Sequence, residues 1–302
     1  MSKIKITLAI AASYFIFAIL LNSVGTVILQ AINTLGVSKT EASVLEGFKD
    51  LSIAIMSFVV ASFIPRLGYK LAMLLALIVV AIACLSTAVI SDFYMFKVLF
   101  AAVGCGFAVV KVSVYSIIGQ VTEDANSHSS LLNTIEGIFM VGVLSGYWVF
   151  TAFIDPVDSN AWLNVYYLLA ALTLLVVVSV VIAPIKPAIK GQRSNSGWND
   201  FIAMLKLTYQ PLVLIFIISA FLYVLIEQGV GTWLPTFNNQ VLQLPVAISI
   251  QLASIFAAAL ALGRLVAGQV LKHIHWFVVL SCCLVAMAAL IIITVTTNGK
   301  LT

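Results

Sequence analysis

Nine long apolar runs, separated by charged residues, proline, glycine and asparagine, constrain this chain more than any other feature of its sequence. An α-helix needs about 20 mostly apolar residues to cross the hydrocarbon core of a bilayer, and each run reaches that length. We therefore predict an all-α integral membrane protein with nine transmembrane helices. The runs lie near residues 6–31, 43–64, 71–91, 94–118, 131–153, 163–183, 211–237, 247–270 and 275–296.

The composition excludes a water-soluble fold. Hydrophobic residues make up 63% of the chain and charged residues 9%, whereas an ordinary soluble domain has about 25% charged residues. The net charge of +4 does not indicate a nucleic-acid partner, because the basic residues lie between the apolar runs and form no basic cluster. The first run continues to about Ala31, which is too long for the apolar region of a signal peptide, so we expect it to be the first span.

The basic residues are distributed unevenly between alternate connections, with ten on the N-terminal side of the predicted spans and three on the opposite side. Cytoplasmic loops of membrane proteins carry an excess of lysine and arginine. We therefore predict a multi-pass plasma-membrane protein of the bacterial inner-membrane type, with a cytoplasmic N-terminus. The ten are Lys3, Lys5, Arg66, Lys70, Lys186, Lys190, Arg193, Lys206, Arg264 and Lys272, and the three are Lys39, Lys97 and Lys300.

The longest connection, residues 184–210, follows the sixth predicted span and contains two prolines, two glycines and four basic residues. Transporters built from two six-helix halves, each made of three-helix repeats, have an internal linker at this place. We predict an N-terminal six-helix bundle at residues 1–183, a cytoplasmic linker at 184–210, and a partial C-terminal bundle of three helices at 211–302.

Charged residues inside the predicted spans are candidate functional residues, because each costs at least about 2.5–3.5 kcal/mol at a helix centre on insertion scales. Glu46 lies one helical turn from both Lys49 and Asp50, so the three share a face near the outer third of the second span. This cluster is either a structural ion pair between helices or a set of gating or solute-binding charges.

Lys111 and Glu136 lie at matching predicted depths in the fourth and fifth spans, which a short loop joins. Neighbouring helices would bring the two side chains together as a buried ion pair. The pair is either structural or switchable, in which case solute or proton binding to one partner frees the other. Aromatic residues such as Tyr14 and Tyr115 are either anchors at the membrane interface or rings that stack on a sugar.

Glu227, in the seventh predicted span, is followed by two glycines and Pro235, which weaken that helix end. Discontinuous helices often mark solute sites in transporters, although glycine also allows helices to pack closely. Asn22, Ser23, Thr26 and Gln30 form a polar stripe on the outer half of the first span. This stripe either lines a cavity or joins neighbouring helices by hydrogen bonds.

The sequence contains no readable nucleotide-binding loop, metal-ligand cluster or Ser/His/Asp constellation. We therefore expect neither an enzyme nor an ATP-driven pump, and no cofactor or metal.

The connection after the second span, ASFIPRLGYK at residues 61–70, resembles the major facilitator superfamily motif G-x-L-x-D-R-x-G-R-K and keeps its Arg66, Gly68 and Lys70. In the second half, LGRLVAG at residues 262–268 resembles the equivalent turn after the eighth span. The resemblance implies short basic turns that help to control an inner gate. Their residues in the second half are Gly263, Arg264 and Gly268.

Three further segments are similar to the fucose permease-like sugar transporters of that superfamily: GCG at residues 104–106 leading to Lys111, the segment from Asn133 to Gly146, and YVLIEQGVGTWLP at residues 223–235. That branch uses membrane acids in its first and fourth spans for proton coupling, and the nearest positions here hold Thr26 and Lys111. Members normally have twelve spans. The resemblance therefore implies a chain truncated after nine spans.

We expect a secondary active transporter of a small polar solute, sugar-like or another organic metabolite, with protons as an optional coupling ion. It would work by rocking two helix bundles around a central site. Its partners would be the solute and the lipid bilayer, and it would be a monomer. The alternatives are a truncated membrane protein that does not transport and an exporter of the drug/metabolite type.

Overall fold

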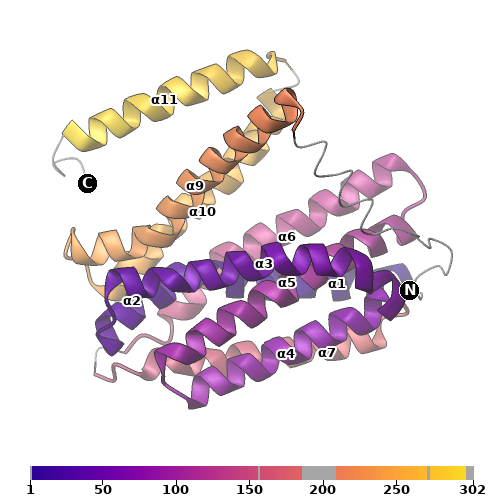
Figure 1. Ribbon diagram of the computed structural model, residues 1–302, viewed down its shortest axis with the longest axis horizontal. Helices are drawn as coiled ribbons and strands as arrows, with labels where there is room; N and C mark the ends of the chain where they lie inside the picture. Colours follow the sequence, from indigo (N-terminus) through magenta and orange to yellow (C-terminus); the bar gives the residue numbers. More distant parts are fainter. Residues whose placement is uncertain (1, 156, 186–208, 271–272, 297–302) are drawn as a thin grey trace. The chain divides into compact units, whose positions relative to one another are not determined.

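The computed structural model describes residues 2–155, 157–185, 209–270 and 273–296, and all regular structure within these ranges is helical (Figure 1). Every predicted apolar run contains a helix. The elements are α1 (Ser2–Asn22), α2 (Val24–Leu35), α3 (Lys39–Leu67), α4 (Tyr69–Val89), α5 (Phe93–Val121), α6 (Ala125–Thr151), the 3-10 helix η1 (Ala161–Asn164), α7 (Val165–Ile182), α9 (Pro211–Gln240), α10 (Val246–Val270) and α11 (Trp276–Thr296).

Seven segments of the described chain are long and apolar enough to cross a membrane, and α11 contributes a shorter apolar stretch at Phe277–Ile293. The segment that carries Glu46, Lys49 and Asp50, α3, is not among the seven. The all-helical membrane class predicted from the sequence is confirmed. The seven segments are Lys3–Leu35, Tyr69–Val89, Phe93–Val121, Ala125–Thr151, Ala161–Ile182, Pro211–Gln240 and Val246–Gly263.

The chain divides into two compact units, Met1–Ile255 and Phe256–Thr302, with the boundary inside α10. Unit 1 holds α1 to α7, α9 and the first part of α10, and one continuous hydrophobic core lies among α1 to α7. Unit 2 holds the rest of α10 and α11, whose side chains are mostly exposed. The predicted linker at 184–210 lies largely outside the described residues.

Contacts between helix ends show which connections of unit 1 share a side. Lys3 Nζ, at the start of α1, lies 2.9 Å from Glu123 Oε1 in the loop between α5 and α6. Lys70 Nζ, after the turn between α3 and α4, donates to the carbonyls of Val181 (2.7 Å) and Ala183 (2.8 Å) at the end of α7. We call this the N-terminal side, and the opposite side the far side.

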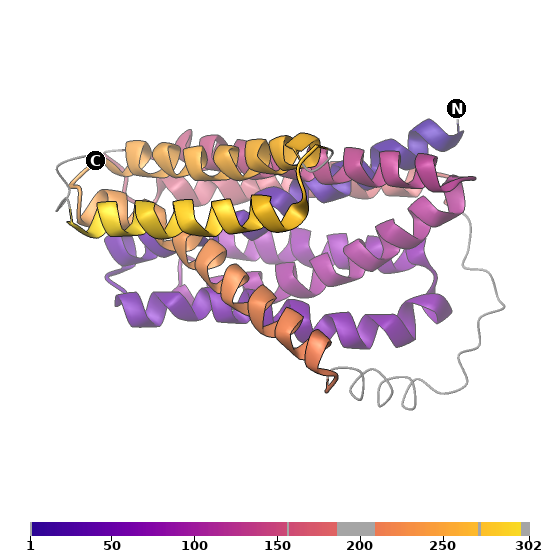
Figure 2. The same cartoon turned by 90° about the horizontal axis from the view of Figure 1, so that it is seen from above.

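On the far side, α9 meets the end of α2. Asn33 Nδ2 donates to Asn239 Oδ1 at 3.1 Å, and Trp233 packs against the hydrophobic core. Figure 2 shows α9, in orange, crossing obliquely toward this contact. The part of α9 before Thr232 is mostly exposed, so α9 is held to the other helices of unit 1 by its far-side end.

The central helix of unit 1 is α5, because α3 and α4 both pack along it while making little contact with each other. Gly104 allows α3 to approach, since a Cβ at this position would collide with the backbone oxygen of Lys49 and lie 3.0 Å from Ser52 Cβ. Small residues permit such close helix packing inside membranes.

The first span is interrupted at Ser23, between α1 and α2, where the sequence predicts a continuous helix. Asn22 Nδ2 donates to the Ala18 carbonyl at 2.9 Å and Ser23 Oγ donates to the Leu20 carbonyl at 2.7 Å. Side chains that bond to helix carbonyls in this way compete with the backbone ladder and bend helices. By contrast, α9 continues through Pro235 to Gln240, so the predicted weak end of that helix is wrong.

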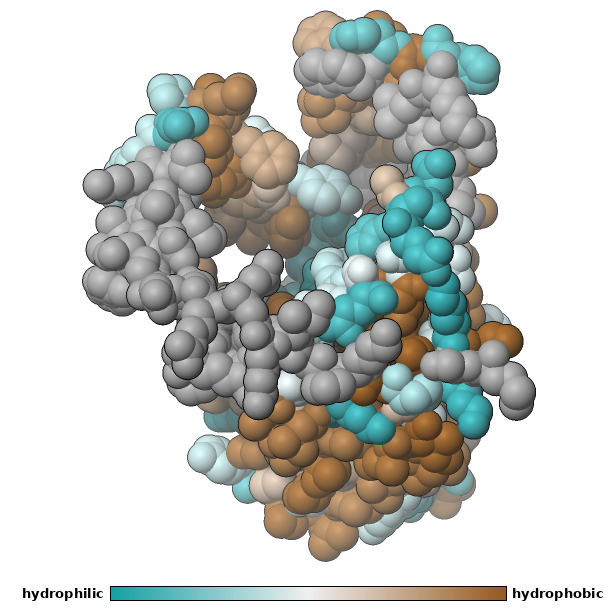
Figure 3. Space-filling model, turned by 90° about the vertical axis from the view of Figure 1, so that its right-hand side faces the viewer, coloured by the Kyte–Doolittle hydropathy of each residue, from teal (hydrophilic) through white to brown (hydrophobic). Residues whose placement is uncertain are grey.

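The outer face of α4 and α7 is apolar. In Figure 3 the lower part of the molecule, where Figure 1 places these two helices, presents a broad brown surface. Such a face is suited to contact with lipid. Its exposed side chains include Leu71, Leu75, Ile78, Val79, Ile82, Leu174, Leu175, Val178, Val181 and Ile182.

Candidate functional site

Charged residues on α3 meet α9 on the far side of unit 1. Thr232 Oγ1 donates to Glu46 Oε1 at 2.6 Å, and Lys49 Nζ lies 4.0 Å from Glu46 Oε1 and 3.4 Å from Asp50 Oδ1. Lys49 is only 4% exposed, so its charge depends on these two carboxylates for compensation. The predicted clustering of the three α3 residues is confirmed, and Thr232 joins them.

Close backbone packing surrounds this cluster. A Cβ at Gly25, on α2, would lie 2.5 Å from the carbonyl oxygen of Thr232, so α2 and α9 touch through their backbones. We call Gly25, Glu46, Lys49 and Thr232 the far-side latch. It joins α2, α3 and α9 through one buried charge, one charge-assisted hydrogen bond and one glycine contact.

Lys111 and Glu136 lie at the same depth in unit 1. Lys111 is ten residues before Val121 and Glu136 is eleven residues after Ala125, which corresponds to about 15 and 16 Å along the helix axes. Half of the hydrocarbon core is about 15 Å thick. The two residues therefore lie at one level inside the spans, in the half on the N-terminal side.

The predicted ion pair between Lys111 and Glu136 is wrong for this structure, because Tyr115 contacts both residues. The Tyr115 hydroxyl donates to Glu136 Oε1 at 2.8 Å. Lys111 Nζ lies 5.8 Å from the centre of the Tyr115 ring and 5.7 Å from that of Phe107, which are cation–π distances. Lys111, Phe107 and Tyr115 share one face of α5 because they are spaced four residues apart.

Aromatic side chains from three helices form a cluster behind these charges. The Phe139 ring centre lies 5.8 Å from those of Tyr14 and Phe107, and Tyr14 lies 6.5 Å from Tyr115. Tyr14 is buried, and its hydroxyl has no hydrogen-bond partner among the described residues. We call Tyr14, Phe107, Tyr115 and Phe139 the aromatic cluster.

Sequence reasoning missed Phe107 and Phe139 as site residues, because an aromatic residue inside an apolar span looks like any other core residue. A usable signal exists for Phe107. It lies one turn before Lys111, as Tyr115 lies one turn after it, and this spacing places all three on one face of a helix. No comparable pattern marks Phe139.

The arrangement around Lys111 is suited to binding a polar molecule. Lys111 is exposed and Glu136 is half-buried, and charged side chains inside membrane spans face protein or a water-filled cavity rather than lipid. The site offers an ammonium donor, a carboxylate acceptor and the faces of aromatic rings. Small-molecule sites are typically lined by apolar and aromatic side chains, with a few polar groups that orient the ligand.

The remaining polar residues of the first span are used in packing. The Asn22 amide bonds within its own helix, and Thr26 and Gln30 are 2% and 4% exposed. The stripe therefore lies between helices and does not line an open cavity. Glu227 is half-buried on α9, five residues before Thr232.

The turns that resemble family motifs are only partly described. Gly68 has φ of +87° and connects α3 to α4, a backbone conformation that glycine adopts readily. Lys70 binds the last carbonyls of α7, and Gly263 is exposed in unit 2. The side-chain surroundings of the other three predicted gating residues, Arg66, Arg264 and Gly268, lie outside the described part of the chain.

A bundle of long apolar helices with charged side chains inside its spans defines a multi-pass membrane protein. The chain belongs to the Major Facilitator Superfamily, because a sequence profile of that superfamily matches residues 10–301. Membership confirms the predicted superfamily and a transporter rather than an enzyme. It also excludes the drug/metabolite-type alternative.

Three solved structures share the fold. The D-xylose-proton symporter has a TM-score of 0.64 at 13% identity, over 90% of this chain and 70% of its own. A mutant of the nucleoside transporter NupG has a TM-score of 0.69 at 16% identity, over 88% of this chain and 68% of its own. Another NupG structure has a TM-score of 0.55 at 17% identity, over 88% of this chain and 67% of its own. No curated protein sequence matches the chain significantly.

Proposed function

We propose that this protein is a secondary transporter that moves a small, polar, ring-bearing solute across the plasma membrane by alternating access. One observation carries the proposal. Lys111, Tyr115 and Glu136 lie together inside the spans, and Tyr115 joins the two charged residues to the rest of the aromatic cluster; ionisable residues inside membrane spans mark solute and ion pathways.

The chemistry of this site favours a sugar-like solute. The Lys111 ammonium would donate to hydroxyl oxygens and the Glu136 carboxylate would accept from hydroxyl groups. The exposed face of Tyr115 would stack against the apolar face of a ring. The D-xylose-proton symporter and the nucleoside transporter, both of the same fold, are named for solutes of this kind, and this supports the similarity of the sequence to fucose permease-like transporters.

We propose Glu136 as the group that carries a coupling proton. Its carboxylate accepts a hydrogen bond from Tyr115. Protonation would weaken that bond and free Tyr115, which also contacts Lys111. A proton could therefore change how the site presents both polar groups to the solute. The partly buried Glu227 on α9 stays a second candidate for a solute or coupling site.

The far-side latch supports an alternating-access cycle. It holds the far-side end of α9 against α2 and α3, while the start of α9 is exposed. We propose that the latch, together with the neighbouring Asp50, is closed in this state and separates when the site opens to the far side. The turns around Gly68 and Gly263, with their basic residues, would gate the N-terminal side.

The remaining organisation proposed from the sequence fits this cycle. Residues 1–183 would form a six-helix bundle and residues 211–302 three helices of a second bundle, joined by a cytoplasmic linker at 184–210. The N-terminus would be cytoplasmic, in a bacterial-type inner membrane. The protein would act as a monomer.

The test is uptake into vesicles of phosphatidylethanolamine and phosphatidylglycerol containing the purified chain, with radiolabelled pentoses, hexoses and nucleosides. Lys111→Ala and Glu136→Gln should lower the initial rate at least about tenfold, since each removes a charged contact with the solute. The matched controls are Lys97→Ala, a lysine on the same helix, and Glu123→Gln, a loop acid. They should stay within about threefold of the parent rate.

Two results would count against the proposal. If the folded parent chain moves no solute of the panel, the transport function is wrong. If the control variants lose as much rate as Lys111→Ala and Glu136→Gln, the site is wrong. Proton coupling has its own readout, because Glu136→Gln should abolish any acceleration by an imposed pH gradient.

A further inference from the structure

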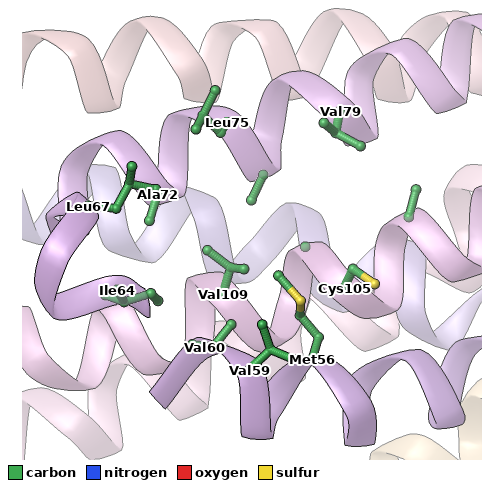
Figure 4. Close-up of a pocket in the computed structure, with 13 residues that line it drawn as sticks. Met56, Val59, Val60, Ile64, Leu67, Ala72, Leu75, Val79, Cys105 and Val109 are labelled. Atoms are coloured by element: carbon green, nitrogen blue, oxygen red, sulfur yellow. The ribbon is translucent and has the colours of Figure 1, made fainter. Parts of the chain in front are cut away.

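An apolar crevice opens on the side of unit 1, between α3 and α4 and above α5 (Figure 4). Its volume is about 250 Å³, and among the described residues every one that lines it is apolar. Met56 and Ile64 come from α3, Val79 from α4, and Cys105 and Val109 from α5. The crevice lies apart from Lys111, Glu136 and the far-side latch, none of which contributes to its lining.

The crevice exists because α5 separates its two neighbours. Both α3 and α4 pack along α5, yet they make little contact with each other beyond the turn that joins them. Ala72 and Ala76 on α4 and Ala102 on α5 line the gap with small side chains. The sequence therefore leaves space where larger residues would have joined the helices.

The mouth of the crevice faces outward. Val79 is 53% exposed and Leu67 is 47% exposed, and both contribute to the lining. In a membrane protein, an outward-facing apolar surface at span depth is in contact with hydrocarbon. Water would find no polar partner among the lining residues.

The crevice opens toward the N-terminal side. On α3 its lining runs from Leu67, the last residue of the helix, to Met56, a rise of about 16 Å. On α5 it runs from Val109 to Ala102, which lie twelve and nineteen residues before Val121. The crevice therefore begins near the N-terminal side and reaches past the level of Lys111.

We propose that this crevice binds an acyl chain of a phospholipid from the leaflet on the N-terminal side. The headgroup would lie on the N-terminal side, near the turn at Gly68 that joins α3 to α4.

An acyl chain would prefer the crevice to the surrounding bilayer because of its contacts with the protein, and not because of the hydrophobic effect. Lipid tails are as apolar as leucine, so moving a tail from the bilayer to the protein removes no surface from water. In the crevice, however, the tail touches α3, α4 and α5 together, and each atom pair at optimal separation adds a small dispersion energy. The bound chain also replaces the missing contact between α3 and α4. This inference does not depend on the proposed transport function.

The test is photocrosslinking in vesicles of phosphatidylethanolamine and phosphatidylglycerol doped with phosphatidylglycerol that carries a diazirine in one acyl chain. Crosslinks are mapped by mass spectrometry. Labelling of Met56–Ile64 and Ala102–Val109 should exceed labelling of the equally apolar, exposed face of α7 at least about threefold. The α7 face serves as the internal reference in every sample.

Filling the crevice should abolish that excess. Ala76→Phe and Ala102→Leu place larger side chains in the gap, and each should bring the labelling ratio to about one, because the tail loses its three-sided contact. The control is Ile82→Phe, an exposed position on α4 outside the crevice, which should leave the ratio unchanged.

Equal labelling of the crevice and α7 in the parent protein would overturn the proposal, whatever the variants do. So would a threefold excess that persists in both filled variants. If Ala76→Phe fails to fold, Ala102→Leu and the parent ratio still decide.

Discussion

Replacing Gly25 by alanine tests the far-side latch most directly. A Cβ at Gly25 would lie 2.5 Å from the carbonyl oxygen of Thr232 and 3.1 Å from its Cα. All these neighbours are backbone atoms, so no side-chain rotation can relieve the collision. Either α2 and α9 stay in place under strain, or they separate and break the hydrogen bond between Thr232 and Glu46.

Both routes lead to a similar loss of stability. Overpacking costs about 1–3 kcal/mol, and a hydrogen bond to a charged group contributes about 1.5–3 kcal/mol. Alanine in a helix is better than glycine by about 1 kcal/mol. The net destabilisation of Gly25→Ala should therefore be about 0.5–2 kcal/mol, which lowers Tm by about 1–8 °C in a protein of this size.

The matched control is Gly146→Ala on α6. A Cβ there would meet its nearest atom at 3.5 Å, an ordinary van der Waals contact. This variant should keep or raise Tm by up to a few degrees, because it gains helix propensity without a collision. Thermal unfolding of both variants in detergent measures the difference.

A crosslink reports on the latch itself. Asn33 and Asn239 are in side-chain contact, so cysteines at both positions should form a disulfide between α2 and α9, in a background without the four native cysteines. Gly25→Ala should slow this reaction and Gly146→Ala should not. Equal Tm values and equal crosslinking rates for the two variants would refute the role of Gly25.

Three other perturbations have defined outcomes. Lys70→Met removes two hydrogen bonds to the last carbonyls of α7, so thermal unfolding should show a loss of about 1–2 kcal/mol, absent in Lys5→Met. Gly104→Ala forces α5 away from the Lys49 backbone and should lower Tm as Gly25→Ala does. The hydrogen bond and charge of Lys3 lower the pKa of Glu123, so this pair stabilises the folded state above about pH 4.3 and less as pH falls. Lys3→Ala should therefore lower Tm at neutral pH, and the difference from the parent should vanish once Glu123 is protonated.

The helices could be predicted from the sequence because length and hydropathy decide which segments cross a membrane. The break in the first span could not, since it depends on Asn22 and Ser23 turning back to bond to carbonyls of their own helix. Those residue types more often signal only a polar face. The sequence also predicts a weak helix end around Pro235, whereas α9 is continuous there. Tertiary packing explains the difference, because this end of α9 packs on α2.

The candidate site was predictable in depth but not in pairing. Counting residues from the helix ends places Lys111 and Glu136 at one level, yet only the structure shows that Tyr115 binds the carboxylate. The contact between Glu46 and Thr232 joins residues 186 positions apart. Nothing in either segment alone indicates this contact, because it is made by tertiary packing.

The interruption at Ser23 separates a single membrane span into two parts that pack against different helices. Its first part, α1, packs with α5, α6 and α7, whereas α2 packs with α9 and α3. Local opening of a protein follows such contact groups rather than the order of the chain. Amide hydrogen exchange of α2 should therefore rise and fall together with the far-side end of α9, while α1 keeps the slow exchange of the core.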